Sequence, residues 1–376
     1  MIKPYKKDDA ADGALFQAPK DDRFAACGYT PTKEDSGWYV LLIVCGLGLV
    51  LLAGCKEGVH GTSDWQGPPS AGAELVPQAR GILKAALEEQ DPVSRVNAIE
   101  VVAATRQIRM MPAVEGMLRD NAVPVRFAAC LAVGDVQYSL AEKQVAPLLN
   151  DMNQNVRIAA AYAMYRLGQT GTYDIVLKAV ASPDQTLRAN AAMLLGKAKD
   201  KTALKYLWWT LGREDSDFKV RFQAAESIAM LGDERIFPKL WATVLSAYAD
   251  DRIMGIRGMG ALATAKAKEV LITKLDDDAL DVRLAAAEQL GILGDNTGEP
   301  EVHDVFTKNL TAGLRGPELE RTRTLAAMAI GRIASPRLTA MLPQLLKDPS
   351  PAVRIAAAKA VLLIAAKGHD YGKLGT

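Results

Sequence analysis

The side chains that most often bind metals or attack substrates are few and scattered in this sequence. No two cysteines form a Cys-x-x-Cys pair, which argues against a zinc site, a haem attachment site and a redox dithiol. The patterns G-x-S-x-G and H-E-x-x-H, the P-loop and the dinucleotide-binding glycine fingerprint do not occur either. We therefore predict no catalytic residue, no metal site and no cofactor. Cys130, among the alanines of VRFAACLAV, is expected to be a small buried residue.

One cysteine stands in a more specific context. Residues 38–54, WYVLLIVCGLGLVLLAG, carry no charge and are long enough for a short membrane span. They end in Leu52-Ala53-Gly54-Cys55, which resembles the bacterial lipobox, where the chain is cut before a cysteine that receives a lipid. The resemblance implies a lipoprotein-type signal segment at residues 38–55, with Cys55 as the lipidation site. Because 37 residues precede the segment, an uncleaved membrane anchor remains the alternative.

Either alternative gives the same organisation for the rest of the chain. Residues 1–37 mix charges, Pro and Gly and are predicted to be a disordered tail, whereas residues 56–74 are predicted to be a flexible linker. Residues 75–367 form the folded part and residues 368–376 a C-terminal tail. Arg23 and Lys33 precede the segment, which favours an N-terminus inside the cell. We expect the folded part to be membrane-anchored on the periplasmic side of a bacterial cell envelope.

The folded part repeats a motif centred on an arginine. Small residues recur three positions after it, and aspartates that suit turns and helix N-caps precede it. The spacings between successive arginines are 31, 31, 31, 33, 36, 26, 40 and 31 residues. Such a period indicates two-helix units stacked side by side. We predict an all-α fold, an α-α superhelix of about nine helix pairs, anchored on Arg95, Arg126, Arg157, Arg188, Arg221, Arg257, Arg283, Arg323 and Arg354.

The motif, seen in NVRIAAAYAMYRLG (155–168) and DVRLAAAEQLGILG (281–294), resembles HEAT repeats, especially the short repeats of phycobilisome lyase-type proteins. The resemblance implies an armadillo-like solenoid in which the arginine and a turn aspartate hydrogen-bond between neighbouring units. It assigns this structural ladder to Arg126, Arg157, Arg188, Arg221, Arg283 and Arg354. Units six and eight depart from the spacing, so we expect a kink or a protruding loop near residues 294–318.

A partner-binding surface is expected on the concave face, at the position five residues after each arginine. These residues are Glu100, Leu131, Tyr162, Met193, Glu226, Leu262, Glu288, Met328 and Lys359. Exposed Leu131, Tyr162 and Met193, with Arg166 and Lys197 beside them, would suit an acidic amphipathic peptide. Burial of this strip between units is the alternative. A second candidate surface contains Trp208, Trp209 and Trp241, because adjacent tryptophans cannot both face one core.

These features favour a membrane-tethered, non-catalytic scaffold that binds a protein or peptide partner outside the cytoplasm. The formal net charge of +1 argues against a nucleic-acid partner. The resemblance to the lyase repeats implies an alternative, a bilin-lyase-like enzyme or an accessory subunit of a membrane enzyme complex. A structural envelope protein without a specific client is the third possibility.

Overall fold

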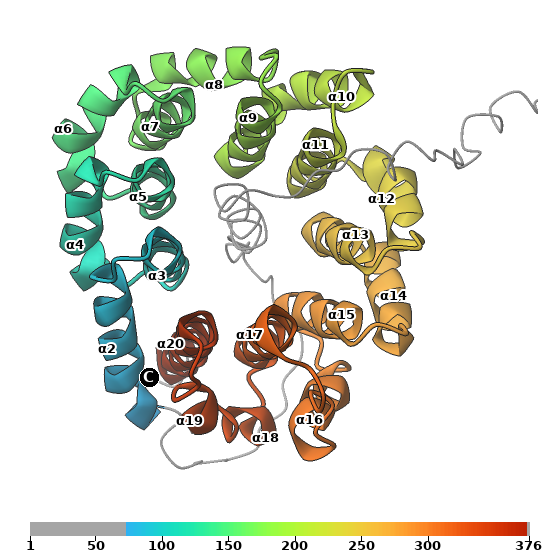
Figure 1. Ribbon diagram of the computed structural model, residues 1–376. Coiled ribbons are helices and arrows are strands. Elements are labelled where there is room, and N and C mark those ends of the chain that lie inside the picture. The colour runs from blue at the N-terminus through green and yellow to red at the C-terminus, as the bar shows by residue number, and fades with distance from the viewer. Residues whose placement is uncertain (1–72, 374–376) are drawn as a thin grey trace, which may run out of the picture. The chain divides into compact units, whose positions relative to one another are not determined.

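The computed structural model describes residues 73–373, and side chains up to residue 367. Every regular element in this range is a helix, and the helices form an inner and an outer layer (Figure 1). The inner helices are α3 (Pro92–Ala104), α5 (Val123–Val136), α7 (Gln154–Arg166), α9 (Gln185–Ala198), α11 (Phe218–Met230), α13 (Ala249–Leu262), α15 (Leu280–Ile292), α17 (Gly316–Ile333) and α20 (Pro351–Lys373).

The outer helices are shorter, and 3-10 turns interrupt or extend most of them. They are α2 (Val76–Leu87), α4 (Met111–Gly116), α6 (Glu142–Val145), α8 (Tyr173–Ala179), α10 (Leu204–Gly212), α12 (Phe237–Val244), α14 (Ala265–Thr273), α16 (Glu299–Thr307), α18 (Pro336–Thr339) and α19 (Leu342–Leu345). The 3-10 helices are η2 (Ala73–Leu75), η3 (Ile108–Met110), η4 (Met117–Arg119), η5 (Ser139–Ala141), η6 (Ala146–Asn150), η7 (Thr170–Thr172), η8 (Lys201–Ala203), η9 (Glu234–Ile236) and η10 (Lys274–Asp276). Each inner helix pairs with the outer segment before it. The prediction of an all-α superhelix of about nine helix pairs is therefore confirmed.

The first and last pairs of the described residues meet. Both α2 and α3 pack against α20, so residues 73–373 close into a ring (Figure 1). Leu83 and Leu87 of α2 and Ile355 of α20 are buried. The ring therefore buries apolar side chains of its first and last pairs, as well as those between successive pairs.

Neighbouring inner helices approach closely at glycines. A Cβ atom on Gly331 of α17 would lie 2.6 Å from Ala360 Cα of α20, and one on Gly291 of α15 would lie 2.9 Å from the backbone of Arg332. Equivalent approaches occur at Gly134, Gly196 and Gly260. All five glycines lie near the end of an inner helix, where only a residue without a side chain permits the observed packing.

Turn chemistry follows the sequence pattern. Asp91, Asp184 and Asp217 accept backbone N–H bonds as the N-caps of α3, α9 and α11. Gly168 and Gly232 follow the ends of α7 and α11 with φ of +105° and +76°, a conformation that glycine adopts without strain. No helix within residues 73–373 is both long and apolar enough to span a bilayer. The predicted segment at residues 38–55 lies outside the described residues, as do the predicted tail at 1–37 and nearly all of the predicted linker at 56–74.

Candidate functional site: the inner face of the ring

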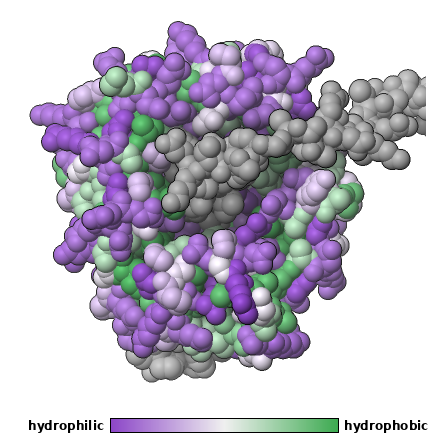
Figure 2. Space-filling model, in the orientation of Figure 1, coloured by the Kyte–Doolittle hydropathy of each residue, from purple (hydrophilic) through white to green (hydrophobic). Residues whose placement is uncertain are grey.

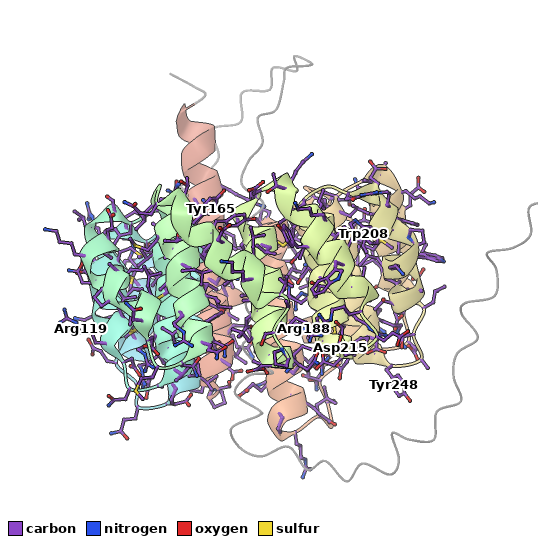
Figure 3. All side chains as sticks on the ribbon, turned by 90° about the horizontal axis from the view of Figure 1, so that it is seen from above. Arg119, Tyr165, Arg188, Trp208, Asp215 and Tyr248 are labelled. Atoms are coloured by element: carbon purple, nitrogen blue, oxygen red, sulfur yellow. The ribbon has the colours of Figure 1, made fainter. Side chains whose placement is uncertain are left out.

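Arginine rungs connect the units along one edge of the ring. The Arg126 guanidinium donates to both carboxylate oxygens of Asp151 in the next turn, at 2.9 and 3.1 Å, and to the Asp120 carbonyl at 2.8 Å. Burial tends to raise the pKa of Asp151, but these bonds lower it overall. Arg188 pairs with Asp215 in the same way (Figure 3). Further rungs join Arg95 to Asp120, Arg252 to Asp277 and Arg323 to Asp348.

The six arginines assigned to the ladder by resemblance do not all form the same bonds. Arg126 and Arg188 reach aspartates, and Arg283 reaches Glu301 of α16 at 2.9 Å. Within the described residues, Arg157, Arg221 and Arg354 bind only backbone carbonyls of their own turn. The rung position holds a serine, Ser182 or Ser246, after Arg157 and Arg221. Serine is shorter than aspartate and carries no charge, so those rungs are absent.

Unit six (α12 and α13) corrects the predicted register. The rung arginine is Arg252, whose guanidinium binds the carbonyls of Ser246 and Ala247 and pairs with Asp277 at 2.7 Å. The prediction that Arg257 anchors this unit is wrong. Glycines at several positions of α13 fit the small-residue pattern in either register. With Arg252, the spacings of 36 and 26 residues become 31 and 31. No irregularity remains in this unit.

Unit eight (α16 and α17) contains a true insertion. Arg323 is the eighth residue of α17, whereas Arg283 is the fourth residue of α15. The additional residues form the linker 308–315 and one extra turn at the start of α17. A cleft of about 380 Å³ lies beside this turn, but its Arg323 pairs with Asp348 and its Glu320 accepts from Ser350. These contacts hold the unit together.

The corrected register places an ionisable side chain on the inner face of every inner helix. Arg257 replaces Leu262 at the position five residues after the rung arginine. A second set of ionisable side chains lies nine residues after each of several rung-position arginines. The resulting girdle contains Glu100, Asp135, Tyr162, Arg166, Lys197, Glu226, Arg257, Glu288, Arg332 and Lys359. Sequence reasoning missed Asp135, Arg257 and Arg332, which a consistent 31-residue register would have revealed.

The predicted apolar strip is not exposed. Leu131, Tyr162 and Met193 are only 5%, 1% and 3% exposed, because the inner helices pack too closely to leave them open. Burial raises the pKa of the Tyr162 hydroxyl, which donates to Asp135 at 2.7 Å. The expectation of an exposed apolar strip at these positions is therefore wrong, and the alternative of burial applies.

The charged neighbours of this strip converge on Asp135. Lys197 of α9 pairs with Asp135 of α5 at 2.8 Å, spanning α7 between them. Arg166 of α7 donates to the Lys197 carbonyl at 3.4 Å. The structure thus brings together Tyr162, Arg166 and Lys197 as one polar network. Its bonds connect three inner helices near their C-terminal ends, in the unit whose Arg157 rung is missing.

The other half of the girdle combines an ion pair with a cluster of one carboxylate and two cations. Glu226 of α11 accepts from Arg257 of α13 at 3.1 Å, and both are buried. Glu288, Arg332 and Lys359 come from α15, α17 and α20. Burial, and then the nearby Arg332 cation, lower the pKa of Lys359 to about 8, whereas burial raises the pKa of Glu288. Such groups respond strongly to a charged ligand, because few waters screen them.

The outer tryptophans behave as predicted for adjacent residues. Trp209 of α10 is 48% exposed and Trp241 of α12 is 38% exposed, while Trp208 is half-buried and donates to Asp233 at 3.0 Å. Cys130 is fully buried, which raises the pKa of its thiol. Among the described residues, no group of His, Cys, Asp and Glu side chains is arranged to hold a metal ion.

Known proteins share this architecture. The HEAT repeat family matches residues 173–253 and 307–368. These segments carry HEAT repeats. Together with the nine helix pairs, they identify the fold of the described residues as a HEAT-repeat solenoid.

Several solved structures are similar at low sequence identity. The CpcE–CpcF complex of phycocyanin lyase from Nostoc sp. is 18% identical, with 67% of this chain and 94% of that chain covered and a TM-score of 0.40. Human deoxyhypusine hydroxylase is 16% identical, with 70% and 98% covered and a TM-score of 0.35. Kap121p is 15% identical, with 80% and 43% covered and a TM-score of 0.33. Among curated proteins, none matches the sequence.

Proposed function

We propose that the protein is a non-catalytic scaffold, held at a membrane through residues 38–55 or a lipid on Cys55, that binds a protein or peptide partner. The ring of ionisable side chains on its inner face carries the proposal. Every inner helix contributes to it, and its less buried members on α3, α5, α7, α9 and α17 offer charges to a polar segment of a partner.

The bonding of the girdle supports a binding role more than a catalytic one. Tyr162, Asp135 and Lys197 are already bonded to one another, and Glu226 is bonded to Arg257. These bonds fix the side chains in place, which lowers the entropy lost when a partner binds. The members of the girdle that are not fully buried are the ones that a partner would contact, and they are Glu100, Asp135, Arg166, Lys197 and Arg332.

Site-specific photo-crosslinking tests the binding surface. A photoreactive residue at Arg166 should give a discrete cross-linked product in membranes of producing cells. The same residue at the exposed Lys143, on outer helix α6, serves as the matched control. Equal products from both positions, or none from Arg166, would contradict inner-face binding.

Two further experiments test the tether and the absence of catalysis. Intact mass of the membrane-extracted protein should show a chain that starts at acylated Cys55 or one that retains residues 38–55. A chain lacking both would contradict the tether. Incubation with a free bilin and an acceptor protein should leave the visible spectrum unchanged, and stable pigment transfer would favour the lyase alternative.

A further inference from the structure

The outer face of units five to seven gathers exposed aromatic residues on neighbouring helices. Trp208, Trp241 and Ile272 occupy the same repeat position, twenty residues after Arg188, Arg221 and Arg252. They lie on the consecutive outer helices α10, α12 and α14. Trp209 adds a further exposed ring. We call Trp208, Trp209, Phe237, Trp241 and Ile272 the outer aromatic surface. At this repeat position, units two and eight carry Glu115 and the buried His303 instead.

Cationic side chains lie over several of these rings. The Arg213 guanidinium is 4.6 Å from the centre of the Trp209 ring, and the Lys266 ammonium is 4.3 Å from that of Phe237. Phe237 in turn stacks on Trp241 with 6.4 Å between the ring centres. Exposed cations over aromatic rings combine two features that are enriched at the centres of protein interfaces. They also occupy ring faces on which nucleic-acid bases would otherwise stack.

The same helices are strongly basic. Residues 201–213, 234–245 and 265–274 contain only two acidic residues, Glu234 and Glu269. Arg213, Arg235, Lys268 and Lys274 pair with aspartates of adjacent turns. Lys205, Lys239 and Lys266 are exposed and have no carboxylate partner within the described residues. A ligand for this surface must therefore supply both apolar side chains and negative charge.

The position of the surface favours a partner away from the membrane. Within the ring, α12 lies on the opposite side from α2, the helix nearest the predicted tether (Figure 1). The outer aromatic surface would therefore face the surrounding compartment when the tether holds the ring at the membrane.

We propose that the outer aromatic surface binds an acidic amphipathic helix of a partner protein. The apolar face of that helix packs on Trp209, Trp241 and Ile272, and its flanking carboxylates pair with Lys205, Lys239 and Lys266. This inference rests on the proposed scaffold role and adds a second binding surface to it. The inner face binds one segment and the outer aromatic surface another.

Peptide binding to the detergent-solubilised full chain tests this proposal. The probe is a fluorescent 18-residue peptide with leucines on one helical face and glutamates beside them. Its controls are a scrambled peptide of the same composition and a peptide with lysines in place of the glutamates. Fluorescence anisotropy should show at least ten-fold tighter binding of the acidic amphipathic peptide than of either control. The variants W209A/W241A and K205E/K239E/K266E should each weaken that binding at least ten-fold.

A second charge-reversal variant, on lysines outside the surface, controls for nonspecific electrostatics and folding. K84E/K143E reverses two exposed lysines on α2 and α6, far along the ring from the surface, and should bind the peptide as the wild type does. Equal weakening by K84E/K143E, or equal binding of the three peptides, would overturn the proposal. So would stronger competition by anionic lipid vesicles or RNA than by the peptide. Because crosslinking from Arg166 and the mass of the N-terminus are measured separately, failure here leaves the scaffold and tether proposals standing.

Discussion

Helices α13 and α17 each carry a rung arginine and a second arginine on the inner face, but the second arginines have different surroundings. Arg257 of α13 meets Glu226, so a positive charge is matched by a negative one at 3.1 Å. Arg332 of α17 lies near Lys359 as well as Glu288, and burial lowers the pKa of both cations. The second arginine of unit six thus faces a carboxylate, whereas that of unit eight lies near both a carboxylate and a second cation.

The difference separates two uses of a buried charge in one fold. A rung arginine also satisfies backbone carbonyls at the end of an outer helix, so it has no apolar substitute. The inner-face pair joins side chains: Glu226 accepts from Arg257 and also from the Gln223 amide at 2.9 Å. The rung arginine should therefore be indispensable for stability, whereas apolar side chains should be able to replace the inner-face pair.

Removal of a rung should have the largest effect. Arg252→Leu with Asp277→Leu should lower the free energy of unfolding by about 3 kcal/mol, because the carbonyls of Ser246 and Ala247 lose their donor. Glu226→Leu with Arg257→Leu should cost less, about 1–2 kcal/mol, because both charges leave together and only the Gln223 amide loses an acceptor. Chemical denaturation of the full chain measures both. Similar losses in the two double variants would show that rung and pair are equivalent.

The second-largest loss of stability is expected from overpacking next to Arg332. Gly331→Val should destabilise the protein by about 2 kcal/mol, because its side chain would meet the α20 backbone at Ala360. Gly81 of α2 has free space where a Cβ atom would lie, so Gly81→Ala should instead stabilise the protein by up to about 1 kcal/mol. Thermal unfolding followed by circular dichroism compares the two. If Gly331→Val left the unfolding temperature unchanged, α17 and α20 would have to move apart at little cost.

The buried Lys359 of unit nine predicts that stability depends on pH. The folded-state pKa of Lys359 is about 8, below the ordinary value, so its protonated form opposes folding at neutral pH. Lys359→Met should stabilise the protein by roughly 1–2 kcal/mol at pH 7. This advantage should shrink as the pH rises above 8 and vanish near the ordinary lysine pKa. Denaturation from pH 6 to 10.5 measures it, and a constant advantage would contradict burial of the charged lysine.

The insertion in unit eight should have the smallest effect. Deletion of residues 311–314 should change the free energy of unfolding by less than about 1 kcal/mol, because this linker lies on the surface and rungs do not depend on it. Deletion of residues 277–280, in a turn of regular length, removes the Asp277 rung and should prevent cooperative folding. If both deletions were tolerated, rungs would not define the units.

Much of the fold could be predicted because the repeat signal is redundant. Small residues within the helices, aspartates in the turns and glycines after the helix ends, such as Gly168 and Gly232, all indicate the same helix pairs. The register of unit six could not be resolved from residue types, because α13 has an arginine and nearby glycines in two registers. The regular 31-residue spacing and the bonds of Arg252 distinguish them. Exposure of the concave strip depended on curvature, which sequence periodicity does not contain, so Leu131, Tyr162 and Met193 were misjudged.

The Asp135 network was also beyond sequence reasoning. Lys197 reaches across a whole unit to Asp135, 62 residues earlier in the chain. Both residues lie nine positions after a rung arginine, but that register does not show that one side chain can reach the other past the unit between them. The exposure of the outer tryptophans, by contrast, followed from helix geometry alone.

The meeting of α2 and α3 with α20 has a topological consequence. An open solenoid has two end repeats whose outer sides face water and must be polar, whereas here the two end pairs cover each other. The folded part therefore has neighbouring ends and no obligatory first repeat. A circularly permuted chain, joined across α20 and α2 and opened within residues 311–314, would retain every rung of the ring.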